Sequence, residues 1–330
     1  MLRSSEGPRI RPFSQFHQIT HRACSKRLQR AITDFGAEHS FADGAERLFE
    51  HYGIKISPTV VRAITLKHSQ RAELFWNSLE AESLRCGPKK APSCIISEMD
   101  GSMIPIVTTS ETELESDQRK HRKTEWKEIR LCVAQVKGEV NATYAISFDA
   151  GTLHAGLELR KTVEISGCTQ ETFIHGLGDG APWIAAEFER QFGTQASYLI
   201  DFYHVSEYLA KAAPHCCPEQ PELWRHNQQE LLKAGNAEQV LQNLQNVANP
   251  PEDVSTAIGY LQNRRHHLNY KAAIESDLPI GSGLIESGHR HVLQCRLKIP
   301  GAWWLMNSAR SLATLRIIRK NRLWQQFWAA

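Results

Sequence analysis

The clearest pattern of hydrophobic and polar positions lies between residues 172 and 204. Two apolar runs, 172–177 and 196–200, have the length of buried strands, and apolar residues at helical spacing lie between them. This pattern predicts a strand, a helix and a second strand, with the strands parallel and the crossover right-handed. An aspartate closely follows each run, Asp179 and Asp201 respectively. Functional groups in open α/β sheets collect at the carboxyl ends of strands, so we expect both carboxylates at one sheet edge.

A third apolar run, 93–99, also stops on an acid, Asp100, and Gly101 follows it. We expect residues 103–107 to form the second strand of a hairpin after this turn. Three strands that each end on a carboxylate indicate an oxygen-rich metal site of the kind that Mg²⁺ or Mn²⁺ prefers. The alternative is that each aspartate serves only as a turn residue at the end of its strand.

Helical patterns dominate the N-terminal part of the chain. The spacing predicts a helix over 24–35 that ends at Gly36, and a second over 41–52 that ends at Gly53. Ser57 and Pro58 form a cap and first turn for a third helix. Two short helices joined at a glycine resemble a helix-turn-helix, although an ordinary helical hairpin has the same pattern. In the first case the second helix would present Thr59, Arg62, Thr65 and Lys67 to a major groove.

The rest of the chain predicts an α/β fold that is interrupted by a helical insertion. We expect strands over 126–136 and 144–148, a helix over 153–165, helices throughout 203–274, one helix over 284–298 and one over 306–328. The predicted regions are an N-terminal segment that is partly disordered, a helix-turn-helix region, a first part of the catalytic core, an all-helical insertion and a basic C-terminal part of the core. Their ranges are 1–36, 37–86, 93–204, 205–277 and 278–330.

Charge is informative through its distribution, because the net charge of the 330 residues is only +3. The span 290–322 carries eight Lys and Arg residues and no acid, together with Trp303 and Trp304. Such a segment suits a polyanion, although it could also be a solvated basic face with the tryptophans in the core. The eight cysteines lack metal-site spacing, and neither a signal core nor a membrane-length apolar run is present. We therefore predict a reduced, cytoplasmic protein without a membrane partner.

Glu286 is the fourth acid of interest. It lies one turn into the predicted helix that follows a Gly-Ser-Gly entry, and Arg290 is one turn beyond it. A carboxylate that holds a metal beside a base that holds a phosphate would explain this order. An exposed i,i+4 ion pair would explain it equally well.

Six segments together resemble one family of proteins, the DDE transposases of bacterial insertion sequences, in their ISKra-type branch. The resemblance covers roughly residues 93–330, with a looser match over 37–68, and its motifs occur in the family's order. The segments are EMDGSMIPI, EWKEIRL, GLGDGAPWI, LIDFYHVSEYL, PIGSGLIESGHRHVLQCRLKIPGAWW and ARSLATLR. The resemblance implies an RNase H-like mixed sheet flanked by helices, with an all-α insertion.

The resemblance also implies roles for individual residues. Asp100, Asp179 and Glu286 would be the catalytic acids that bind two Mg²⁺ or Mn²⁺ ions. Asp201 and His204 resemble a motif in which the histidine assists catalysis or positions DNA. The residues alone leave Asp179 and Asp201 open as the second metal ligand, and the resemblance favours Asp179.

The expected partner is double-stranded DNA, both the terminal repeats of the element and the target. The family implies a homodimer or a larger synaptic assembly, associated with the nucleoid when bound. Trp303 and Trp304 could stack on an unpaired base, or could belong to the core. The residues expected to contact DNA are Arg62, Lys67, Arg290, Arg296, Lys298, Trp303 and Trp304.

Family members commonly carry further sequence, including a cysteine-rich module, ahead of the helix-turn-helix. We therefore weigh a second hypothesis, a catalytically silent, truncated copy that binds specific DNA sequences. A third is a nuclease of the same fold that cleaves without joining strands.

Overall fold

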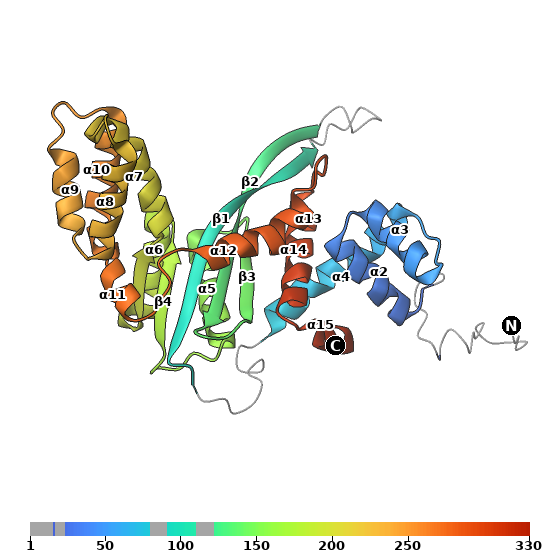
Figure 1. Cartoon of the computed structure of the whole chain (residues 1–330). Coiled ribbons are helices and arrows are strands. Elements are labelled where there is room, and N and C mark those ends of the chain that lie inside the picture. The colour runs from blue at the N-terminus through green and yellow to red at the C-terminus, as the bar shows by residue number, and fades with distance from the viewer. Residues whose placement is uncertain (1–15, 17–23, 80–90, 110–121) are drawn as a thin grey trace, which may run out of the picture. The chain divides into compact units, whose positions relative to one another are not determined.

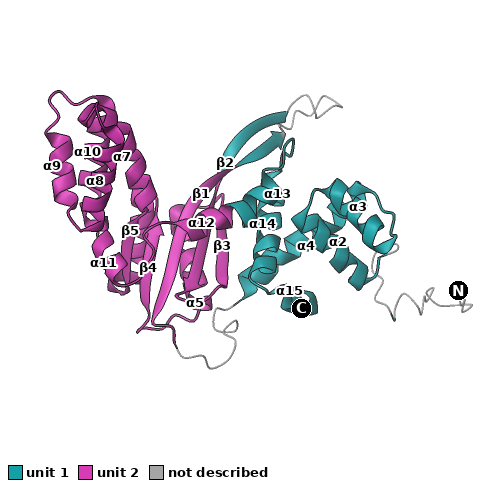
Figure 2. Ribbon diagram, in the orientation of Figure 1, with its two compact units in different colours: residues 1–79, 104–127, 290–330 teal, residues 80–103, 128–289 magenta. Residues whose placement is uncertain are grey.

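The computed structural model describes residue 16 and the ranges 24–79, 91–109 and 122–330. The predicted disorder at the N-terminus therefore falls almost wholly outside the described residues. The fold is of the mixed α/β class, with one five-stranded sheet and many helices (Figure 1). Two compact units share the chain (Figure 2). Unit 1 comprises residues 1–79, 104–127 and 290–330, and unit 2 comprises residues 80–103 and 128–289.

The sheet has the strand order β3-β2-β1-β4-β5. Strands β1, β4 and β5 are parallel to one another, as predicted for β4 and β5. Strands β2 and β3 pair with each other in the antiparallel sense. The strands are β1 (Cys94–Thr109), β2 (Arg122–Val136), β3 (Ala142–Phe148), β4 (Phe173–Gly178) and β5 (Ala196–Ile200).

The predicted hairpin after residue 99 is wrong, because β1 continues without a turn. Asp100 therefore lies within a strand and not at its end. Gly101 instead lets the Glu128 side chain of β2 pack against the β1 backbone, because a Cβ atom at this position would lie 2.4 Å from Oε1 of Glu128. A glycine beside an aspartate is a common turn signal, and here the sheet overrides it.

Two helices, α5 (Thr152–Ile165) and α6 (Pro182–Phe192), cover one face of the sheet in unit 2. Cys132 on β2 contacts the α5 carbonyl of Ala155, with 3.4 Å between sulfur and oxygen. A Cβ atom on Gly176 of β4 would lie 2.6 Å from the ring of Phe188 on α6. The absence of a side chain at Gly176 therefore lets α6 pack directly on the strand.

A series of helices separates β5 from the segment that carries Glu286, in the region predicted to be helical. Leu209, Leu232, Val240 and Leu261 lie in the core that these helices share, and that core continues to Leu199 at the end of β5. The helices are α7 (Phe202–Cys216), α8 (Pro221–Lys233), α9 (Ala237–Gln245), α10 (Glu252–Asn263) and α11 (Tyr270–Glu275).

The helix predicted over 284–298 is not a single α-helix. It begins as α12 (Gly283–Gly288), changes to a π-helix over His289–Gln294 and ends as α13 (Cys295–Leu297). Glu286 and Arg290 thus lie on either side of a change in helical period, and the predicted i,i+4 relationship does not describe this segment. π-Helical segments are rare and occur frequently at functional sites.

In unit 1, α2 (Lys26–Glu38), α3 (Phe41–Tyr52) and α4 (Pro58–Ser78) share a core of Ile32, Ala45, Leu48 and Val61. The predicted Ser57 cap, the first-turn proline and the end of the second helix at Gly53 are confirmed, and Gly53 adopts a left-handed φ of 64°. The predicted end of the first helix at Gly36 is wrong.

Gly36 lies inside α2 because that helix approaches α4 closely. A Cβ atom at this position would lie 2.0 Å from Oγ1 of Thr65. Thr65 is fully buried by this contact, so its predicted exposure to a DNA groove is wrong.

The last predicted helix is also divided, into α14 (Met306–Lys320) and α15 (Trp324–Ala329), because Arg322 adopts a left-handed φ of 64°. Helix α14 packs on α4, and α15 buries Trp324, Phe327 and Trp328. Among the described residues, none of the helices combines the length and the apolar character that crossing a bilayer requires.

Candidate active site

The strand register aligns three of the predicted acids in one row of unit 2. Glu98 of β1 pairs with Leu177 of β4, so continuing this register by two residues places Asp100 beside Asp179. Gly178 pairs with Ile200, and the next residues are Asp179 and Asp201. The backbone N–H of Asp201 donates to the carbonyl of Gly178 at 2.8 Å, so the β4–β5 pairing extends to this row. The β1–β4 pairing itself ends at Glu98 and Leu177, so Asp179 lies one residue past the end of β4, on the side of Asp100.

Asp100 is half-buried in the middle of β1. Its Oδ1 accepts a hydrogen bond from the N–H of Gly101 at 2.7 Å, and its Oδ2 lies 3.2 Å from Nε2 of His289. His289 is buried, and neither of its ring nitrogens makes a well-oriented hydrogen bond within the described part of the chain. Sequence reasoning did not select His289, although it follows Glu286 by three residues, a spacing that puts two helical residues on one side.

Asp179 is half-buried, and its Oδ1 accepts the N–H of Ala181 at 2.7 Å. The surrounding loop is fixed by the insertion: Tyr260 donates its hydroxyl to the carbonyl of Asp179 at 2.7 Å, and Arg264 donates Nε to that of Gly180 at 2.6 Å. Gly180 has φ of 85°, and a Cβ atom there would lie 2.6 Å from the Tyr260 hydroxyl. The lack of a side chain at Gly180 therefore makes room for the Tyr260 hydroxyl.

Asp201 is fully engaged by the protein itself and is only 1% exposed. Its Oδ1 caps helix α7 by accepting the N–H groups of Tyr203 at 2.6 Å and His204 at 3.0 Å. Its Oδ2 accepts both the N–H and the hydroxyl of Ser282, each at 2.5 Å. Four donors occupy this carboxylate, so Asp201 joins the end of β5 to the entry of α12. The half-exposed Asp179 is the better candidate for an external ligand, and the half-buried His204 lies beside this cap.

Glu98 is a buried acid that sequence reasoning missed. It is 1% exposed and accepts the N–H of Ile285, in the first turn of α12, at 2.7 Å. Burial raises the pKa of Glu98 to about 8; this hydrogen bond opposes the shift, and the carboxylates of Asp201 and Glu286 add to it. Residues two apart on a strand share a face, so the position of Glu98 two residues before Asp100 was a usable signal.

Glu286 is exposed in the first turn of α12, on the face of the sheet opposite to α5. The helix lies close to the strands, because a Cβ atom on Gly288 would be 2.9 Å from Cδ2 of Leu131 and 3.0 Å from Cε1 of Tyr144. In the described part of the chain, no three His, Cys, Asp or Glu side chains are grouped so as to hold a metal ion. The acids therefore do not form a finished ligand set among the described residues.

The predicted DNA contacts lie in different environments of unit 1. Arg62, Lys67 and Arg290 are exposed, Trp303 is 45% exposed and Lys298 is half-buried. Arg296 is 2% exposed, and Trp304 is 6% exposed with Nε1 donating to the carbonyl of Leu297 at 3.0 Å. Both residues are packed into the unit, and for Trp304 this agrees with the alternative that it belongs to the core.

Comparison with known sequences gives one partial match. A family model described as Uncharacterised protein family (UPF0236) matches residues 161–271, which run from the end of α5 into α11. The matched range includes Asp179 and Asp201 but neither Asp100 nor Glu286. No curated protein matches the chain.

Proposed function

We propose that this chain is a DNA transposase of the DDE class, which cleaves the ends of an insertion sequence and joins them to target DNA. One observation supports the proposal: Asp100 lies on β1, Asp179 directly follows the neighbouring parallel strand β4, and the helix bearing Glu286 is docked on the sheet through Glu98. The proposal is that these three carboxylates, from remote parts of the sequence, act together at one edge of the sheet.

The strand order supports an RNase H-like core, the fold that the resemblance to ISKra-type transposases implies. Its features are the order β3-β2-β1-β4-β5, the parallel strands β1, β4 and β5, and a helical insertion between β5 and α12. The pair α3 and α4 supports a DNA-binding helix-turn-helix, because Arg62 and Lys67 are exposed on its second helix. We further propose that the protein acts as a dimer or a larger assembly on DNA.

The donor set suits a hard divalent cation. Asp100, Asp179 and Glu286 offer only oxygen atoms; Glu286 is exposed and the two aspartates are partly exposed, so a hard cation such as Mg²⁺ or Mn²⁺ could reach them. Two such ions, when bound, would activate a water or a 3′-hydroxyl and stabilise the leaving oxygen.

The protein's own groups prepare this site. Asp201 and Ser282 fix the entry of α12, and His289 lies beside the Asp100 carboxylate, with 3.2 Å between Nε2 and Oδ2. Glu98 keeps its proton at neutral pH and so adds little negative charge beside the other acids.

A second function has one observation in its favour. Because no three-ligand group is finished in the described part of the chain, a silent DNA-binding copy is the competing hypothesis. It predicts binding to specific DNA without any Mg²⁺-dependent cleavage.

The test is incubation of the full chain with the DNA that flanks its own gene, in Mg²⁺ or Mn²⁺. We expect nicked and joined products, reduced at least about a hundredfold in Asp100→Asn, Asp179→Asn and Glu286→Gln. Asp277→Asn is the matched control, since that side chain is 98% exposed and remote from the row in sequence.

Each other result selects a different function. Binding of this DNA without products from the unaltered protein would favour the silent DNA-binding copy. Nicked products without joined ones would favour a nuclease.

A further inference from the structure

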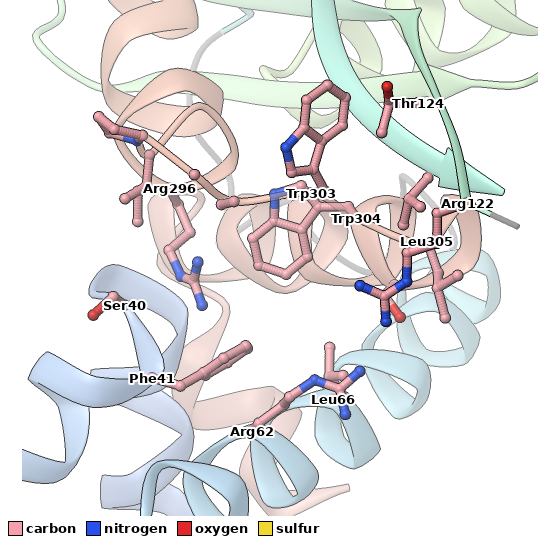
Figure 3. A pocket seen from close by; sticks show the side chains of 16 residues that line it. Ser40, Phe41, Arg62, Leu66, Arg122, Thr124, Arg296, Trp303, Trp304 and Leu305 are labelled. Carbon is pink, nitrogen blue, oxygen red and sulfur yellow. The ribbon is translucent and has the colours of Figure 1, made fainter. Parts of the chain in front are cut away.

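A pocket of about 690 Å³ lies within unit 1, between the start of α3, helix α4, the first residues of β2 and the segment that leads into α14 (Figure 3). We call it the arginine–tryptophan pocket, after Arg62, Arg122, Arg296, Trp303 and Trp304 in its wall. None of the described residues that line it is acidic. The volume lies in the range of small-molecule sites and exceeds what a single inorganic anion needs.

Arg296 is the buried member of this group. Its Nε donates to the carbonyl of Gly36 at 3.1 Å, and its guanidinium lies 4.5 Å from the centre of the Phe41 ring and 4.9 Å from that of Trp304. Its Nη2 is buried and has no hydrogen-bond partner among the described residues. An unmatched donor on a buried cation is costly, so an anion that entered the pocket would satisfy it.

The charge on Arg296 persists at neutral pH. Burial and then the neighbouring Arg316 lower the pKa of Arg296 to about 10, which is still well above neutrality. Arg62 and Arg122 are exposed on the opposite side of the opening, where Figure 3 shows their side chains gathered near Leu66. Two exposed cations and one buried cation thus line the pocket.

The two tryptophans differ in burial: Trp304 is buried in the wall of the pocket, and Trp303 is partly exposed. Trp304 is held by its bond to Leu297 and by an edge contact with Phe41, whose ring centre is 6.2 Å away. Trp303 is 45% exposed and leans on Trp126 with 6.3 Å between ring centres. An exposed indole in a pocket rich in arginine suits a planar base attached to a phosphate.

We propose that the arginine–tryptophan pocket binds one unpaired nucleotide at a DNA end, with its phosphate held by the arginines and its base stacked on Trp303. This inference rests on the proposed function, because it names the form of DNA that the protein would hold. It also revises the expectation for the tryptophan pair: Trp303 stacks on the base, and Trp304 supports Arg296.

The test uses the full chain in the presence of a chelator, so that no cleavage occurs. The probe is a short DNA duplex with one unpaired 2-aminopurine nucleotide that bears a 5′ phosphate, compared with the same duplex with a blunt end. We expect roughly tenfold tighter binding of the probe with the unpaired nucleotide, together with quenching of its fluorescence by stacking.

Two variants and a matched control locate the effect. Trp303→Leu should abolish the quenching and the preference, and Arg62→Ala should reduce the preference. Lys67→Ala is the control, because Lys67 is exposed on the same helix but does not line the pocket. This variant should weaken the binding of both DNAs by the same factor.

Equal affinity for the two DNAs, or unchanged quenching in Trp303→Leu, would overturn the inference. Competition by inorganic phosphate as strong as that by a mononucleotide would also overturn it. Products of cleavage and joining without a preference for the unpaired nucleotide would defeat this inference alone. The preference without such products would defeat only the proposed function.

Discussion

Unit 2 and unit 1 both bury ionisable side chains, but unit 2 buries acids and unit 1 buries arginines. The acids accept hydrogen bonds from backbone N–H groups, whereas the arginines donate to backbone carbonyls. In unit 2, Asp201 and Glu98 accept hydrogen bonds from the backbone N–H groups of Ser282 and Ile285. In unit 1, the fully buried Arg316 donates to three backbone carbonyls and lies 3.2 Å from Glu38. Those carbonyls belong to Val292, Ala37 and His291.

This difference separates buried charges that hold the fold together from those that are free to bind a ligand. Asp201 and Arg316 have their bonding capacity used, and each connects segments that are far apart in sequence. Asp100 and Asp179 belong to the same unit as Asp201, and Arg296 belongs to the same unit as Arg316. These three residues keep polar atoms for which the protein provides few partners. Burial alone therefore does not identify a functional charge, whereas unused hydrogen-bonding capacity does.

The largest effect expected from this comparison concerns Arg316. Arg316→Met should lower the free energy of unfolding by about 3–5 kcal/mol, because three carbonyls and Glu38 would lose a buried partner. Urea denaturation followed by circular dichroism measures this loss. Arg310→Met, on the same helix but half-exposed, should change stability by less than about 1 kcal/mol. Equal losses in the two variants would show that Arg316 does not join these segments.

The next effect distinguishes two neighbours in the acid row. Asp201→Asn should cost about 2–3 kcal/mol of stability, because it weakens charge-assisted bonds to four donors. Asp179→Asn should stay within about 0.5 kcal/mol, since it keeps the acceptor for Ala181. Thermal and urea denaturation of both variants provide the measurement. A larger loss in Asp179→Asn would reverse the roles assigned to the two residues.

The smallest effect depends on pH and concerns Glu98. Burial raises the pKa of Glu98 from its ordinary 4.5 to about 8, so between these values the folded protein keeps a proton that the unfolded chain releases. Stability should therefore fall as the pH rises through this window, by at most about 1.4 kcal/mol per pH unit. Glu98→Gln keeps an acceptor for Ile285 and should remove roughly 2 kcal/mol of the decline between about pH 6 and pH 8. Parallel stability curves for the two proteins would contradict the raised pKa.

Local signals in the sequence predicted much of the fold. The parallel pair β4 and β5, the helix between them and the Ser57–Pro58 start of α4 follow from periodicity and capping, which depend on nearby residues. The errors at Gly36 and Gly101 share one cause. Both glycines leave space for a side chain from another element, and that contact is invisible to local patterns.

The candidate site could be predicted only in part for a similar reason. Asp100, Asp179 and Glu286 were selected by strand ends and by the resemblance, whereas the engagement of Asp201 depends on Ser282, which is remote in sequence. Glu98 was missed because it lies inside an apolar run.

The uninterrupted course of β1 has a mechanical consequence for the row of acids. An aspartate in a hairpin turn can shift with its loop, but Asp100 has strand residues on both sides and so has a fixed Cα atom. Its freedom is limited to the rotation of one short side chain away from His289. In the proposed active site, adjustment to an incoming phosphate would therefore come from the exposed Glu286 and the half-buried Asp179, and Asp100 would be the stationary reference.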